Sequence, residues 1–264
     1  MTPRSLAAAG AAVLHCLAGW GEAEPVRWVL AASQLEWRQQ VVRSAEELAA
    51  LRLGGGLAQA ARAGGRAAHA AHAAPLLPLL EHGTLRLTQP HAVVRHVARC
   101  AGLCGGGAEE QARVDSAAEI VRELRRPLAA LPFVPEAEQE EHMRRALAEG
   151  VGDQMQMLEE SINAQRQQQG GRDDSGVAGA SLSYADILVA EAVDAYDATL
   201  SAGALCGWPA LLALRNRVRA MPQIAAYLAS DLRYPCPRGA AGAEYVKQYD
   251  ALMGAAIVHN SSSV

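Results

Sequence analysis

The chain has 264 residues, half of them apolar and 4% aromatic, and carries a formal net charge of −4 at pH 7. This length accommodates one large domain or two small ones with a substantial core. Because acidic and basic residues are interspersed, the charge pattern excludes a surface built for phosphate backbones or anionic lipids. We therefore expect neither nucleic acid nor a membrane as a partner.

Two further features indicate a soluble cytoplasmic protein. No uninterrupted apolar run reaches the ~18 residues that a membrane-spanning helix needs. The five cysteines are scattered and form no Cys-x-x-Cys pair, as is typical of reduced cytoplasmic thiols. Residues 1–13 could be a weak signal or transit peptide, but Glu22 and Glu24 follow closely. We favour a short tail, residues 1–11, before the folded chain.

Residues 14–28 predict a short strand, a Gly-rich turn and the entry to a helix, with Pro25 in the first helical turn. Trp37 to Val42 predicts a second strand. The stretch 54–75 is rich in Ala, Gly, Arg and His, and we expect a flexible insertion there. Its two histidines, His69 and His72, would give a metal only two ligands. The sequence therefore predicts no metal site.

Order returns at residue 76. Residues 76–81 and 85–87 predict two strands joined by a turn at Gly83, and residues 89–98 predict a closing helix. This βαβ…ββα order is thioredoxin-like, and Pro78 stands where that fold places its cis-proline. The first part of the chain is therefore predicted to be an α/β domain.

The remainder of the chain has helical periodicity almost throughout, and its Ala-rich composition favours helices. A Gly-rich linker, residues 101–110, precedes a helix broken near Pro132, and a second long helix is expected over residues 136–169. A polar loop at 170–180 leads to Ser183-Tyr-Ala-Asp186, a helix N-terminal capping box. This part predicts an all-α domain.

Four stretches together resemble the cytosolic glutathione transferase family, of sigma, alpha or mu type. Residues 14–28 are similar to its opening, Leu-x-Tyr followed by Arg-Gly-Arg-Ala-Glu-Pro-Ile-Arg. Residues 77–98 are similar to its segment that runs from Val-Pro through Gln-Ser to Arg-Tyr-Ile-Ala, and the Ser183 capping box and the segment 208–228 are similar to its later helices. The resemblance spans about residues 13–230. It implies a tail (1–11), a thioredoxin-like glutathione-binding domain (12–100), the linker (101–110), an all-α domain (111–232) and a C-terminal extension (233–264).

The resemblance also implies site residues in the first motif, where the chain departs from the family. Cys16 stands at the position of the family's catalytic Tyr, and Glu22 at that of its second Arg. Cys16 could assist weakly or form a mixed disulfide with glutathione, or it could be a small buried side chain with no chemical role. Glu22 either disfavours a thiolate nearby or points to solvent at the start of the helix.

Glutathione is implied as the co-substrate, bound along Leu77, Pro78, Gln89 and Pro90. Gln89 matches the Gln of the family's Gln-Ser pair, whereas Pro90 lacks the hydroxyl and the N–H that the family's Ser supplies. Asp115 matches an Asp that reaches across a homodimer interface to the γ-glutamyl amino group, although it could equally be an ordinary exposed charge.

Two functions are therefore open. The first is a glutathione transferase that conjugates the glutathione thiol to small hydrophobic electrophiles, or isomerises them, as a cytoplasmic homodimer in detoxification. The second is a glutathione-transferase-like binding or structural protein that has lost catalysis. A Cys16 thiol open to the cleft would favour the first, and a buried one the second.

Overall fold

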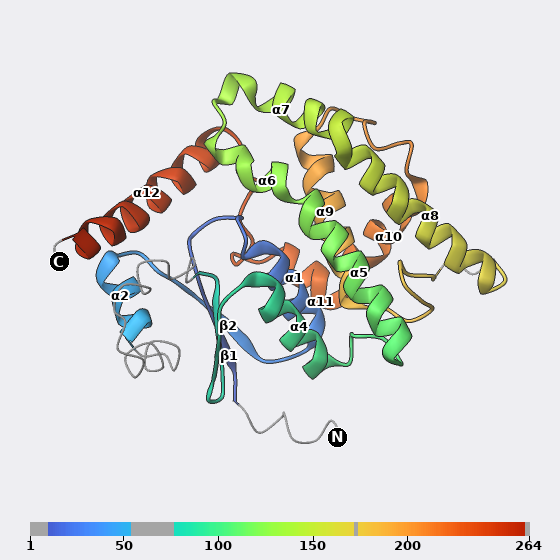
Figure 1. Cartoon of the computed structure of the whole chain (residues 1–264), viewed down its shortest axis with the longest axis horizontal. Helices are drawn as coiled ribbons and strands as arrows, with labels where there is room; N and C mark the ends of the chain where they lie inside the picture. The colour runs from blue at the N-terminus through green and yellow to red at the C-terminus, as the bar shows by residue number, and fades with distance from the viewer. Residues whose placement is uncertain (1–9, 54–76, 172–173, 262–264) are drawn as a thin grey trace.

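The computed structural model describes residues 10–53, 77–171 and 174–261. The predicted insertion at 54–75, with His69 and His72, lies outside the described residues. The described chain forms a small sheet flanked by helices, followed by a larger set of helices (Figure 1). This order confirms the predicted fold class, an α/β thioredoxin-like part followed by an all-α part.

The sheet has four strands in the order β2-β1-β3-β4, formed by Ala12–Cys16 (β1), Trp37–Val41 (β2), Leu79–His82 (β3) and Leu85–Leu87 (β4). β1 and β2 are parallel, while β1–β3 and β3–β4 are antiparallel. The parallel pair requires a crossover, which the first helix supplies, and the antiparallel pair needs only the turn at Gly83. The predicted βαβ…ββα module is confirmed.

Three helices accompany the sheet: α1 (Glu24–Ser33), α2 (Ala45–Leu53) and α4 (Pro90–Ala101). α1 starts with Pro25 in its first turn, as predicted, and is buried along almost its whole length between α4 and α9. The sequence had not led us to expect α2. The peptide bond between Leu77 and Pro78 is cis, which confirms the expectation for Pro78.

The all-α part surrounds α9, a helix buried on nearly every side. The predicted capping box at its start is confirmed, because the Ser183 and Asp186 side chains each bond the other's backbone N–H. The helices of this part are α5 (Ala108–Leu124), α6 (Arg126–Ala130), α7 (Gln139–Ala146), α8 (Gly152–Gln168), α9 (Tyr184–Thr199), α10 (Pro209–Arg219), α11 (Pro222–Leu228) and α12 (Gly239–Ser261).

The prediction of one continuous helix over residues 136–169 is wrong, because the segment is divided into several elements. A 3-10 turn, Glu136–Glu138, precedes α7, and a π-helical turn, Leu147–Val151, separates α7 from α8. Gly150 has a φ of 149° there, a conformation that side-chain-bearing residues rarely adopt. The glycine thus permits a break that the helical periodicity of the flanking residues concealed.

The predicted C-terminal extension contains α12, for which no helix had been predicted. This helix packs against α2 and against the 3-10 turn Leu131–Phe133 (η3) (Figure 1). It therefore links the sheet part of the molecule to the helical part. Among the described residues, no helix combines the length and the apolar character needed to cross a bilayer.

Candidate glutathione site

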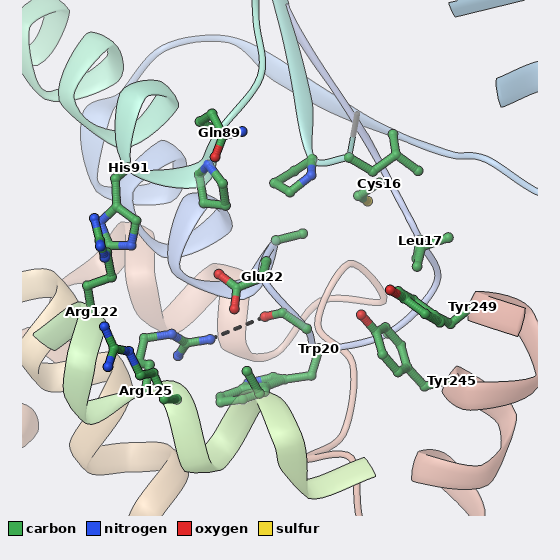
Figure 2. A pocket seen from close by; sticks show the side chains of 18 of the residues that line it. Cys16, Leu17, Trp20, Glu22, Gln89, His91, Arg122, Arg125, Tyr245 and Tyr249 are labelled. Atoms are coloured by element: carbon green, nitrogen blue, oxygen red, sulfur yellow. Dashed lines mark hydrogen bonds between the residues drawn. The ribbon is translucent and has the colours of Figure 1, made fainter. Parts of the chain in front are cut away.

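A cavity of about 780 Å³ opens at the junction of the two parts. Its walls come from the end of β1 and the turn after it, from the residues preceding β3 and α4, and from α5, α6, η3 and α12. Figure 2 shows side chains from these segments converging on one space. The predicted site residues that line it are Cys16, Leu77, Pro78, Gln89 and Pro90, together with Glu22.

Beneath the turn after β1 lies a fully buried polar network, here called the Glu24 network, of Glu24, Arg27, Trp28 and Tyr227. Arg27 Nη1 donates to Glu24 Oε2 at 3.0 Å, and Trp28 Nε1 donates to Glu24 Oε1 at 3.0 Å. The Tyr227 hydroxyl on α11 lies 2.9 Å from both carboxylate oxygens. Because every charged group has a partner, the network fastens α1 to α11 despite its burial.

Arg27 also fixes the turn itself. Its guanidinium donates to the Gly19 carbonyl oxygen at 2.9 Å and, through Nη2, to Cys16 Sγ at 3.3 Å. Cys16 is 0% exposed, and burial raises the pKa of its thiol more than the nearby guanidinium lowers it. The sulfur is therefore engaged with the Glu24 network beneath the turn, which favours the interpretation of Cys16 as a buried structural side chain.

The start of α4 lies at the cavity and carries two of the residues predicted to bind glutathione, Gln89 and Pro90. Gln89 precedes the helix in an unusual backbone conformation, with φ 71° and ψ 110°, and its side chain is exposed. Pro90 occupies the first helical position, so the helix start offers one backbone N–H fewer to an anion. A non-glycine residue held at positive φ costs free energy and typically marks a functional position.

Asp115 does not line the cavity within one chain. It accepts hydrogen bonds from Arg95 Nε at 3.4 Å and from the Tyr184 hydroxyl, and its side chain is 49% exposed. Its predicted contact crosses a dimer interface, so it stays a prediction.

The cavity wall contains four arginines that were not predicted from the sequence: Arg95, Arg122, Arg125 and Arg126. Arg125 is buried, bonds Glu191 on α9, and donates through Nη2 to the Gly21 carbonyl oxygen at 3.2 Å (Figure 2). Its guanidinium also lies 4.5 Å from the centre of the Trp20 ring. Glu119 pairs with Arg95 and Arg122, and Glu191 pairs with Arg125, so part of this charge is balanced within the protein. The arginines still make this the positive wall of the cavity, which Glu22 opposes from the turn.

Two tyrosines of α12, Tyr245 and Tyr249, were also missed; their hydroxyls point into the cavity in Figure 2. The Tyr245 ring packs on the turn at Gly19 and Gly21, whose positive φ values of 142° and 36° favour glycine. A Cβ on Gly21 would stand 2.6 Å from the Tyr245 hydroxyl. Burial, reinforced by Glu22, raises the pKa of Tyr245 to about 12, so its hydroxyl keeps its proton at neutral pH.

Comparison with known proteins agrees with this architecture. Residues 122–231 match the model of the glutathione S-transferase C-terminal domain. The chain is 27% identical over 219 residues to glutathione S-transferase alpha-3 of Rattus norvegicus, covering 83% of this chain and 89% of the relative. It is 26% identical to glutathione S-transferase A3 of Homo sapiens, with the same coverage. The chain belongs to the cytosolic glutathione transferase family.

Two further matches add to this result. Glutathione S-transferase B of Cavia porcellus is 30% identical over 155 residues, which cover 59% of this chain and 65% of that relative. A solved structure, "Structure of NaGST-2", superposes with a TM-score of 0.63 at 21% identity, covering 83% of this chain and 96% of that one. The likeness of the structures extends over both the sheet and the helices.

Proposed function

We propose that this protein binds glutathione in the 780 Å³ cavity and conjugates its thiol to small hydrophobic electrophiles, or isomerises them. One observation carries the proposal: the turn after β1, the cis Leu77–Pro78 bond and the start of α4 meet at a single cavity. These are the segments that the resemblance assigned to glutathione. A cytoplasmic homodimer with a role in detoxification belongs to the same proposal.

Glutathione is an anion with two carboxylates, and the positive wall suits it. The γ-glutamyl end would lie at Gln89 and the start of α4, and the cysteinyl part would bond the backbone of Leu77. Arg122 and Arg126, both exposed at the cavity, are placed to attract the carboxylates. Trp20, Phe133 and Tyr249 leave an apolar surface for the electrophile.

The thiol of bound glutathione needs a hydrogen-bond donor, since Cys16 is buried against Arg27. The Tyr245 hydroxyl is protonated at neutral pH and projects into the space beside the turn that follows Cys16. We assign it the donor role that the family gives to the tyrosine at the Cys16 position. A phenol is a stronger donor than a thiol, and such donors stabilise the thiolate as it forms.

The second candidate is a binding protein without catalysis. It is favoured by the buried Cys16 thiol and by Glu22, whose carboxylate faces the cavity and disfavours a second negative charge. In that case the cavity would still bind glutathione, but the α12 tyrosines would contribute only to packing.

Calorimetry of glutathione binding, on the wild type and on Cys16→Ser, comes first. We expect binding in the micromolar to low-millimolar range, unchanged in Cys16→Ser because the sulfur faces Arg27. No detectable binding would reject glutathione as the ligand and leave a non-catalytic protein with some other partner. Conjugation of a small aromatic electrophile is then compared in wild type, Tyr245→Phe and Tyr249→Phe.

Tyr245→Phe should lower kcat at least about tenfold, with a smaller change in KM, because it removes a donor to the developing thiolate. Tyr249→Phe is the matched control on the next turn of α12. Equal activity in wild type and Tyr245→Phe would remove the donor role from Tyr245. Binding without measurable turnover in the wild type would establish the non-catalytic candidate.

A further inference from the structure

Away from the cavity, three potential metal ligands meet where β3 packs on α4. His82 is the last residue of β3, and His96 and Cys100 lie one turn apart on α4. Their ligand atoms all lie within 4.8 Å of one another, and within the described parts of the chain they are the one such group of three. His82 is buried, while His96 and Cys100 are half-buried, so the group is open to solvent on one side.

Strand and helix periodicity bring the three side chains together. Glu81 turns to the other face of the sheet, where it bonds His15 and Arg86, so its neighbour His82 faces α4. Positions 96 and 100 are i and i+4 on α4, and therefore share the helix face above β3.

Two of the three distances between these atoms are close to those of a tetrahedral zinc centre, and the third, from His82 to Cys100, is within 4.8 Å. His82 Nδ1 lies 3.1 Å from His96 Nε2, and His96 Nε2 lies 3.8 Å from Cys100 Sγ. Zinc bonds of about 2.0 Å to nitrogen and 2.3 Å to sulfur, at tetrahedral angles, separate two nitrogens by about 3.3 Å and nitrogen from sulfur by about 3.6 Å. The imidazole rings meet edge to face at 65°, and the two nitrogens that face each other are the ones that the ion would bridge.

We propose that His82, His96 and Cys100 bind a zinc ion, with water as the fourth ligand, and that the ion clamps β3 to α4. Two imidazoles and a thiolate form the borderline-soft donor set that zinc prefers. On binding, each imidazole stays neutral with its proton on the nitrogen facing away from the ion, and the Cys100 thiol releases one proton to solvent. The His82–His96 hydrogen bond is replaced by two metal bonds.

One charged neighbour of the site is Arg99, on the same helix. Its positive charge acts on His96, and the thiolate that Cys100 would supply to the ion offsets it. Cys104, one turn further on, lies beyond the helix end at Gly102 and outside the group of three. It therefore provides a matched thiol control.

The test uses the untagged full-length protein after removal of metals with a chelator. Cobalt(II) is titrated first, because a thiolate ligand gives it a charge-transfer band in the near ultraviolet and tetrahedral geometry gives intense visible bands. Zinc is then added to displace cobalt. We expect one equivalent to bind, with both sets of bands, and the midpoint of thermal unfolding to rise in excess zinc because the ion binds only the folded chain.

Cys100→Ser and His96→Gln should each weaken cobalt and zinc binding by roughly 100-fold, since removing even a supporting contact of a metal ligand costs 10- to 100-fold. Both sites are half-buried, and circular dichroism of the metal-free variants verifies folding. Cys104→Ser and the double variant His69→Gln/His72→Gln should bind as the wild type does. A missing thiolate band in the wild type, a band that survives Cys100→Ser, or its loss in either control would overturn the proposal.

Discussion

The two faces of the turn after β1 differ in how closely they keep the family pattern. On the buried face, Glu24 and Arg27 match the motif and every charge has a partner. On the cavity face, Glu22 stands where the family has an Arg, and the sulfur of Cys16, at the family's Tyr position, lies on the buried face instead. The difference shows that a motif can be kept for its fold while the residues around the cavity change, because the two faces are under separate physical constraints.

Among changes to the buried face of the turn, we expect Arg27→Ala to reduce stability the most. It removes the partner of a buried carboxylate and the donor to the Gly19 carbonyl, so we expect the free energy of unfolding to fall by roughly 3–5 kcal/mol. Equilibrium unfolding in urea measures this loss of stability. Arg38→Ala, at an exposed position on β2, should change stability by less than about 0.5 kcal/mol. Similar losses in the two variants would contradict the role of the Glu24 network.

A second test concerns Glu191, a buried carboxylate on α9 that lies outside the Glu24 network. Glu191 bonds Arg125, but its Oε1 has no hydrogen-bond partner among the described residues. Burial raises its pKa from 4.5 to about 7. The raised pKa means that the folded state holds the proton more tightly. Its contribution to stability is therefore complete below about pH 4.5 and is lost as the pH rises through about 7.

We expect the stability of the wild type relative to Glu191→Gln to decline by a few kcal/mol between pH 4.5 and 7. Unfolding in urea at a series of pH values measures this difference. A flat difference across that range would show that Glu191 is charged throughout.

The substitution Pro90→Ser replaces a residue that lines the cavity with the serine found at this position in the family. Serine adds a hydroxyl and an N–H at the start of α4, each able to bond the γ-glutamyl carboxylate. Glutathione should bind about 5- to 30-fold more tightly by calorimetry, corresponding to about 1–2 kcal/mol. Pro209→Ser, at the same helical position of α10, is the control and should leave the affinity unchanged. Equal affinities in all three proteins would place the carboxylate elsewhere.

The smallest effect is expected for Glu22→Gln, which removes one negative charge from the cavity face. Because Glu22 is exposed, water screens the charge, and we expect glutathione affinity to rise only about 2- to 5-fold, less at high salt. Glu36→Gln, also exposed but outside the cavity lining, serves as the comparison. Unchanged binding in Glu22→Gln would mean that this carboxylate does not act on the ligand.

Elements whose structure depends on residues close together in the sequence were predictable. These are the strands, the α9 capping box and the cis-proline position, each determined by neighbouring residues or by a motif of about ten residues. α2 also had a local signal that the sequence analysis overlooked: Ser44 accepts from the Glu47 N–H, and Glu47 accepts from the Arg43 N–H, an arrangement close to a capping box.

The rest of the site depends on contacts between distant segments. The burial of Cys16 follows from the position of Arg27 across the turn, and Arg125 reaches the turn only because α5 and α9 hold it there. Tyr245 lies more than 200 residues after Gly19 and Gly21, whose lack of side chains admits its ring. No spacing within one segment encodes such a contact.

The position of α12 has a consequence for the synthesis of the protein. The cavity wall runs from Cys16 to Tyr249, and α12 reaches it by packing on α2 and η3. A nascent chain can form its sheet and most of its helices while the ribosome is still adding residues. The cavity is closed only after Tyr249 has emerged from the exit tunnel, so a shortened translation product would fold around an unfinished pocket.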